Sequence, residues 1–184
     1  MPVVAHPRQG RCGRRRPWHD PDPHVNTDEH RPARPWPHSN GAAAWVGYLS
    51  VLPLVLGLAA VGLPRDYGAR ELAQRTTIAW AAVLLAFSGA VHWGLALAGR
   101  LPWTRQRIAA ALAPAVIGAA AVVIAGQRAL ALLVIGFGGL WLYEHRGMTA
   151  ELPEDYLNLR RQLSIAICLV LALTMFVSDA AGLT

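Results

Sequence analysis

The side chains best suited to chemistry lie within or beside long apolar runs. His92 and Trp93 stand inside residues 86–97, an otherwise apolar segment, and Ser88 comes one helical turn before His92. An imidazole gains or loses a proton near neutral pH, and an ionisable side chain inside a membrane span indicates a functional site. His92 is therefore the first candidate for an intramembrane polar site.

Further ionisable side chains occur at the ends of later apolar runs and extend this candidate site. Glu144 and His145 follow one run, and Arg160 comes shortly before the last. The predicted intramembrane polar site contains His92, Ser88, Trp93, Glu144, His145 and Arg160. The alternative is that His92 bonds only to Ser88 or a backbone carbonyl, while the other side chains are solvated. We assign no catalytic residue and no metal ligand.

Five apolar runs predict the helices that would position these side chains. The expected membrane spans are residues 42–63, 76–98, 108–125, 129–143 and 163–181. One helix over residues 108–143 would measure roughly 54 Å, against a hydrocarbon core of about 30 Å, so a tight hairpin is expected at residues 126–128. Residues 64–75 read as a polar loop. A new helix is expected to open at Pro153 and lead into the last span.

The predicted fold class is all-α, a polytopic membrane helix bundle of five transmembrane helices with a disordered N-terminal tail. The bundle is expected to occupy residues 42–184. Residues 1–41 are rich in proline, arginine and histidine and poor in aliphatic side chains. Such a segment buries too little apolar surface to offset the entropy lost on ordering, which predicts disorder.

The second span has one face of small and polar residues. Ser88, Gly89, His92 and Ala96 share this face by helical spacing, whereas Phe87 lies on the opposite, apolar face. Small residues allow membrane helices to approach closely, and Ser or His can hydrogen-bond between them. His92 is therefore predicted to point into the bundle and to contact the third, fourth or fifth span.

The arginines predict an orientation in the membrane, because basic residues near span ends concentrate on the cytoplasmic side. Eight arginines fall on the side of the N-terminal tail, and four fall on the other side. The first group is Arg31, Arg34, Arg100, Arg105, Arg107, Arg146, Arg160 and Arg161; the second is Arg65, Arg70, Arg75 and Arg128. The count predicts a multi-pass protein of the bacterial cytoplasmic (inner) membrane, with the N-terminus cytoplasmic and the C-terminus outside. In a eukaryote, the mitochondrial inner membrane would take its place.

The net charge of +6 and the pI near 10.3 are accounted for by this asymmetry, so nucleic acid is not an expected partner. The expected partners are the lipid bilayer and, in addition, further copies of the chain or other membrane proteins. No cofactor is expected. A haem b site would need His92 and His145 as ligands, and these two differ in depth by about 12 Å on an ideal helix.

Two segments resemble a known group of proteins. Residues 87–97 (FSGAVHWGLAL) and residues 156–163 (YLNLRRQL), together with Pro53 in the first span, resemble an uncharacterised bacterial membrane family of unknown function. Its eukaryotic relative is mitochondrial transmembrane protein 69. The likeness extends from about Trp45 to Val177 and leaves out the N-terminal tail. It implies a small multi-helix inner-membrane domain and supplies no activity or ligand.

The residues support four hypotheses about the function. The leading one is a non-enzymatic integral inner-membrane protein that acts through its helix bundle or partner proteins, since no HExxH, CxxC, nucleophile elbow or phosphate loop is found. The alternative is a small transporter or proton-linked carrier with His92 as the titrating group. A haem b protein and an intramembrane enzyme that uses His92 and Glu144 rank below these.

Overall fold

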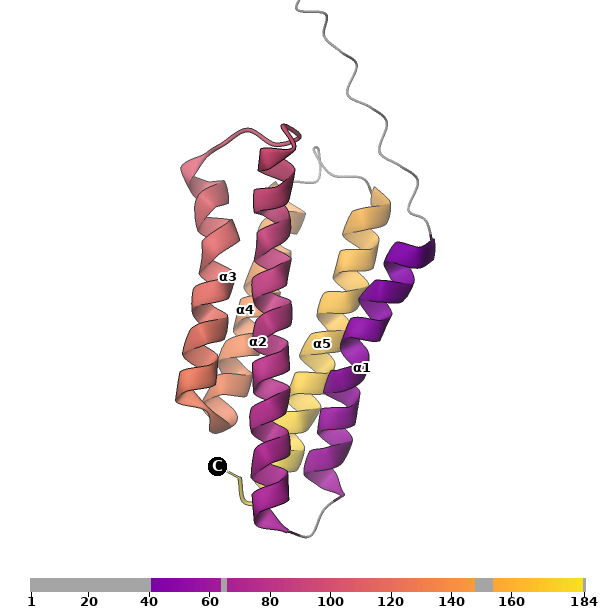
Figure 1. Ribbon diagram of the computed structural model, residues 1–184, viewed down its shortest axis with the longest axis vertical. Coiled ribbons are helices and arrows are strands. Elements are labelled where there is room, and N and C mark those ends of the chain that lie inside the picture. Colours follow the sequence, from indigo (N-terminus) through magenta and orange to yellow (C-terminus); the bar gives the residue numbers. More distant parts are fainter. Residues whose placement is uncertain (1–40, 64–65, 148–153, 184) are drawn as a thin grey trace, which may run out of the picture. The chain divides into compact units, whose positions relative to one another are not determined.

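The computed structural model describes residues 41–63, 66–147 and 154–183, which form five α-helices and no strand (Figure 1). All five are long and apolar enough to cross a membrane, which confirms the predicted all-α membrane bundle. Apart from Gly41, the expected tail lies outside the described residues. The helices are α1 (Gly41–Gly62), α2 (Tyr67–Leu97), α3 (Arg105–Ile124), α4 (Gly126–Gly147) and α5 (Glu154–Ala180).

Helix α2 begins earlier than expected, and the prediction of a polar loop over residues 64–75 is wrong for most of its length. Asp66 caps the helix, because its carboxylate accepts a hydrogen bond from the Ala69 backbone N–H at 2.9 Å. Glu71 and Arg75, four residues apart, form an exposed ion pair. At 31 residues, α2 measures about 46 Å, so its polar first turns extend past a hydrocarbon core of about 30 Å.

The hairpin between α3 and α4 is confirmed and is tighter than predicted. Only Ala125 separates the two helices, and it adopts a left-handed φ of 54° followed by Gly126 at 65°. As a result α4 has 22 residues instead of the 15 expected over 129–143, which gives it a length of about 33 Å. It therefore spans the hydrocarbon core without local thinning of the bilayer.

Helix α5 joins two predicted pieces into one. It begins at Glu154, with Glu154 and Asp155 in its first turn, and continues without a break through the expected span over 163–181 to Ala180. Acidic side chains at this position favour a helix start, because they interact with the positive end of the helix dipole. Pro153 lies outside the described residues.

The helices pack around a core in which α2 takes the central position. Each helix contacts its neighbours in the chain, α5 also contacts α1, and α2 reaches across the bundle to α4 and α5. The buried middle layer is aliphatic and includes Leu54, Ile78, Leu85, Leu133 and Leu171. Glycines bring helices close together: a Cβ on Gly89 would lie 2.7 Å from the Ala111 carbonyl oxygen of α3. This confirms that the small-residue face of α2 is a packing face.

Successive helices run in opposite directions, so the bundle has two distinct ends (Figure 1). One end holds the starts of α1, α3 and α5 and the ends of α2 and α4; we call it the Arg-rich end. The other holds the α3–α4 turn and is called the hairpin end. The described arginines divide between Arg100, Arg105, Arg107, Arg146, Arg160 and Arg161 at the Arg-rich end, and Arg70, Arg75 and Arg128 at the hairpin end.

Candidate functional site

Four of the six predicted site residues meet in a buried network at the Arg-rich end. The Nε of Arg160 donates to both carboxylate oxygens of Glu144, at 3.2 and 3.0 Å. The Nη1 of Arg160 donates to the Ser88 hydroxyl oxygen at 2.9 Å. The Nε2 of His92 lies 3.5 Å from Glu144 Oε1. We call these four residues the network; they connect α2, α4 and α5.

Helical spacing carries each of these side chains to the interior. On α2, Ser88 and His92 continue the buried row that contains Leu85. On α4, Glu144 comes one turn after buried Leu140. On α5, Arg160 comes one turn before buried Ser164 and is the least enclosed member of the network. The apolar rows that fill the core therefore also fix the polar side chains at its end.

Because the network is buried, each of its charged side chains is stabilised by the others and not by water. The side chain of Glu144 is 1% exposed, that of His92 is 2% exposed, and that of Arg160 is 15% exposed. A carboxylate removed from water needs a cation and hydrogen bonds, and Arg160 supplies both. The network thus contains one paired acid and base, with the imidazole of His92 on the remaining side of the carboxylate.

The surroundings of His92 limit what it can do. Its ring packs at a tilt against Tyr143, with the centroids 6.1 Å apart, and its Nδ1 has no hydrogen-bond partner among the described residues. The Nε2 faces Glu144 at 3.5 Å, at the outer limit of a hydrogen bond. Chemically, the arrangement can join three helices; its one hydroxyl, that of Ser88, accepts a hydrogen bond from Arg160 Nη1.

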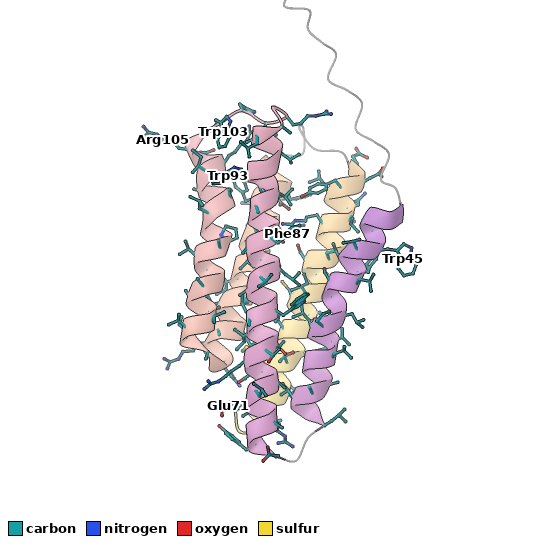
Figure 2. The ribbon with its side chains drawn as sticks, in the orientation of Figure 1. Trp45, Glu71, Phe87, Trp93, Trp103 and Arg105 are labelled. Atoms are coloured by element: carbon teal, nitrogen blue, oxygen red, sulfur yellow. The ribbon has the colours of Figure 1, made fainter. Side chains whose placement is uncertain are left out.

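The other two predicted residues, Trp93 and His145, lie outside the network. Trp93 is 46% exposed and packs edge to face on Trp103, with ring centroids 6.3 Å apart, at the Arg-rich end (Figure 2). His145 is exposed and stacks on Trp141 at 5.4 Å. Adjacent residues on a helix point about 100° apart, so Trp93 cannot share the face of His92, nor His145 that of Glu144. This separation also places His92 and His145, the two candidate haem ligands, in different surroundings.

No group of three or more His, Cys, Asp or Glu side chains arranged to hold a metal ion is found within residues 41–63, 66–147 and 154–183. Glu144, the acid nearest to His92, already has both oxygens engaged by Arg160.

A second set of buried polar side chains at the hairpin end was missed by the sequence analysis. Gln74, Thr77, Thr174 and Ser178 are buried there on the inner faces of α2 and α5. The signal was available, because these positions continue the same helical rows as Ser88 and Ser164. Gln74 was overlooked because it fell within the expected polar loop.

Asp179, at the same end, accepts a hydrogen bond from the Gln127 amide of α4 at 3.3 Å. The Gln127 amide also donates to the Met175 carbonyl oxygen at 3.3 Å, so it connects α4 to α5.

A comparison with protein families gives one match that covers most of the chain. The model of the family described as "Protein of unknown function (DUF3429)" matches residues 39–176, about three quarters of the 184 residues and all but the last turn of the helical bundle. Comparison with curated proteins and with solved structures gives no match. The matched region contains the whole network, and the chain, whose five helices are long and apolar enough to cross a membrane, belongs to the DUF3429 family of proteins of unknown function.

Proposed function

We propose that this protein is a non-enzymatic integral membrane protein that acts through its helix bundle or through partner proteins. The observation that carries the proposal is the network, in which one buried carboxylate is bonded to arginine and faces histidine from two other helices. Such a junction fixes the relative positions of α2, α4 and α5 and so gives the bundle a defined surface for other proteins.

The physical argument is that the polar groups of the network are occupied with one another. Arg160 uses Nε on Glu144 and Nη1 on Ser88, so its charge is directed at the bundle and not at a substrate. Buried ionic groups commonly specify how helices associate, even where they add little net stability. The exposed outer faces, with Phe87, Val116 and Phe176, are suited to lipid or to the helices of partners.

The test compares two histidine variants of the full chain. His92→Ala should lower the yield of folded, monodisperse protein and the amount of co-purifying membrane protein found by cross-linking and mass spectrometry. His38→Ala removes a histidine that precedes the helical bundle in the sequence and should leave both unchanged. Equal behaviour of the two variants would contradict the proposal.

A second candidate, a small transporter or proton-linked carrier, is supported by the contact between His92 and Glu144. A titratable pair buried in a membrane protein is typical of proton relays. Against it, the inner face of α2 between Ser88 and Thr77 carries only aliphatic side chains, among them Ile78, Ala81 and Leu85, and these are fully buried. Conduction would therefore require the bundle to open. A pH-dependent flux in proteoliposomes that His92→Ala abolishes and His38→Ala retains would favour the carrier, and absence of any flux would dismiss it.

We further propose that the protein lies in the bacterial cytoplasmic membrane, with the Arg-rich end towards the cytoplasm. The support is the excess of arginines at that end. A relation to mitochondrial transmembrane protein 69 belongs to the same proposal and would place a eukaryotic counterpart in the mitochondrial inner membrane. An enzymatic reporter fused after Thr184 should be active only on the outer face; activity in the cytoplasm would reverse the assigned orientation.

A further inference from the structure

A small polar pocket opens beside the network at the Arg-rich end. It lies between the last turns of α4 and the first turns of α5 and has a volume of about 160 Å³. Its ionisable lining consists of Glu144, His145, Glu154, Arg160 and Arg161. By comparison, the grooves on the lipid-facing sides of the bundle are lined mainly by apolar side chains. This pocket is therefore suited to a charged ligand.

Two acidic and two basic side chains line the pocket. Glu144 and Arg160 are committed to each other within the network. Arg161 and Glu154 remain, both exposed, and neither forms an ion pair with another of the described residues. Among its described lining residues, the pocket thus offers one cation and one anion outside the network, with the imidazole of His145 as a further hydrogen-bonding group. A simple anion would bind Arg161 but would be repelled by Glu154.

The position of a tryptophan in the lining indicates that the pocket lies at the depth of the lipid headgroups. Trp141 lines it, half-buried, with His145 stacked on its ring at an interplanar angle of 10°. Tryptophan gathers at the boundary between hydrocarbon and water. Asn158, a neutral donor and acceptor, completes the polar lining on the side of α5. A ligand that carries both charges and resides at this boundary would satisfy every one of these groups.

We propose that this pocket binds a zwitterionic phosphate–ammonium group of the phosphoethanolamine type, with the phosphate on Arg161 and His145 and the primary ammonium on Glu154. Phosphate accepts charge-assisted hydrogen bonds from a guanidinium, and a primary ammonium donates them to a carboxylate. A quaternary ammonium has no N–H to donate, so a phosphocholine group fits less well. The inference goes beyond the proposed function, because it concerns residues outside the network.

The chain offers a matched control for each of the two free charges. Arg161→Gln and Glu154→Gln alter the pocket. Arg146→Gln and Asp155→Asn remove the same charges from exposed positions at the same helix ends that do not line it. None of these four substitutions touches the network, so a failure here would leave the proposed role of the network standing.

The experiment measures retained lipid by native mass spectrometry on the full chain, reconstituted with equal amounts of phosphatidylethanolamine, phosphatidylglycerol and phosphatidylcholine. The unsubstituted chain should retain phosphatidylethanolamine preferentially. Arg161→Gln should lower that retention by about tenfold, the equivalent of one charge-assisted hydrogen bond. Glu154→Gln should lower retention of phosphatidylethanolamine and raise that of phosphatidylglycerol, whereas Arg146→Gln and Asp155→Asn should change neither.

A second arm distinguishes the two sources of this chemistry. Free phosphoethanolamine is added to the detergent-solubilised protein, and its effect on the thermal transition is measured. Stabilisation by the free compound that Arg161→Gln and Glu154→Gln abolish would identify a soluble ligand, and retention of the lipid alone would identify the headgroup. The proposal is overturned if neither source binds, if phosphatidylglycerol is preferred by the unsubstituted chain, or if the control variants behave like the pocket variants.

Discussion

The two ends of the bundle interior are both polar, but their buried side chains form different kinds of hydrogen bond. At the Arg-rich end, side chains of α2, α4 and α5 bond to one another through Glu144 and Arg160. At the hairpin end, the buried hydroxyls of Thr77 and Thr174 donate to the carbonyl oxygens of Ala73 and Val170, each in its own helix. A hydroxyl that is already bonded within its own helix contributes little to the choice of the neighbouring helix.

The hairpin end instead relies on shape. Gly57 of α1 lies against the side chain of Thr77 so closely that any Cβ would overlap the threonine hydroxyl. Close contact through small residues is a usual way for membrane helices to recognise each other. The buried interior is thus specified by charge at one end and by fit at the other, while the bonds from Gln127 to Met175 and Asp179 join α4 to α5 outside the buried set of the hairpin end. Variants at the two ends should differ in size of effect and in what rescues them.

Removal of Arg160 should have the largest effect. Arg160→Met leaves the Glu144 carboxylate, 1% exposed, without its cation, and an uncompensated buried charge costs about 3–5 kcal/mol of unfolding free energy. This loss of unfolding free energy is measured in mixed detergent micelles, with unfolding monitored by circular dichroism. Arg161→Met removes a neighbouring exposed arginine and should cost less than about 1 kcal/mol. Similar losses for both would mean that Glu144 does not depend on Arg160.

A substitution at the hairpin end should cause an intermediate loss of stability, and a smaller side chain on the facing helix should restore it. Gly57→Ala forces α1 away from Thr77 and should cost about 1–3 kcal/mol in the same unfolding assay. Gly62→Ala, whose Cβ would lie at an ordinary 3.5 Å from Val177 Cγ1, serves as the control. Adding Thr77→Ala should recover much of the loss; no recovery would show that the contact between α1 and α2 is not limited by this pair.

The smallest effect is expected where a hydroxyl bonds within its own helix. Thr174→Val keeps the shape of the side chain and frees only the Val170 carbonyl, which still takes part in the helix, so the change should stay within about 1 kcal/mol. Thermal unfolding in detergent is sufficient to measure it. A loss as large as that of Arg160→Met would mean that Thr174 bonds across helices and that the two ends do not differ.

The sequence was sufficient to predict the helices and the interior face of α2. Hydropathy located all five spans, and the small residues around His92 indicated which side of α2 is buried. The start of α2 was missed because the charged residues 70–75 were interpreted as a loop. Asp66 as a cap and the Glu71–Arg75 pair are both helix signals that can be recognised in the sequence.

The candidate site was predictable in part, for a geometric reason. Glu144 and Arg160 were grouped with His92 because they occur at the same end of the bundle, and they do meet there. Trp93 and His145 were included as sequence neighbours, although a 100° turn per residue directs them elsewhere. That Arg160 bonds to Ser88 could not be foreseen, since it depends on how α2 and α5 pack across the bundle.

The central claim, that Glu144 and Arg160 act as one unit which joins α4 to α5 and α2, is tested most directly by a double-mutant cycle. The free energies of unfolding of Glu144→Gln, Arg160→Met, the double variant and the unsubstituted chain are compared in one detergent. The account predicts that the double variant loses less than the sum of the two single losses, by about 2 kcal/mol. Additivity within about 0.5 kcal/mol would contradict it and would reduce the network to separate, independent contacts.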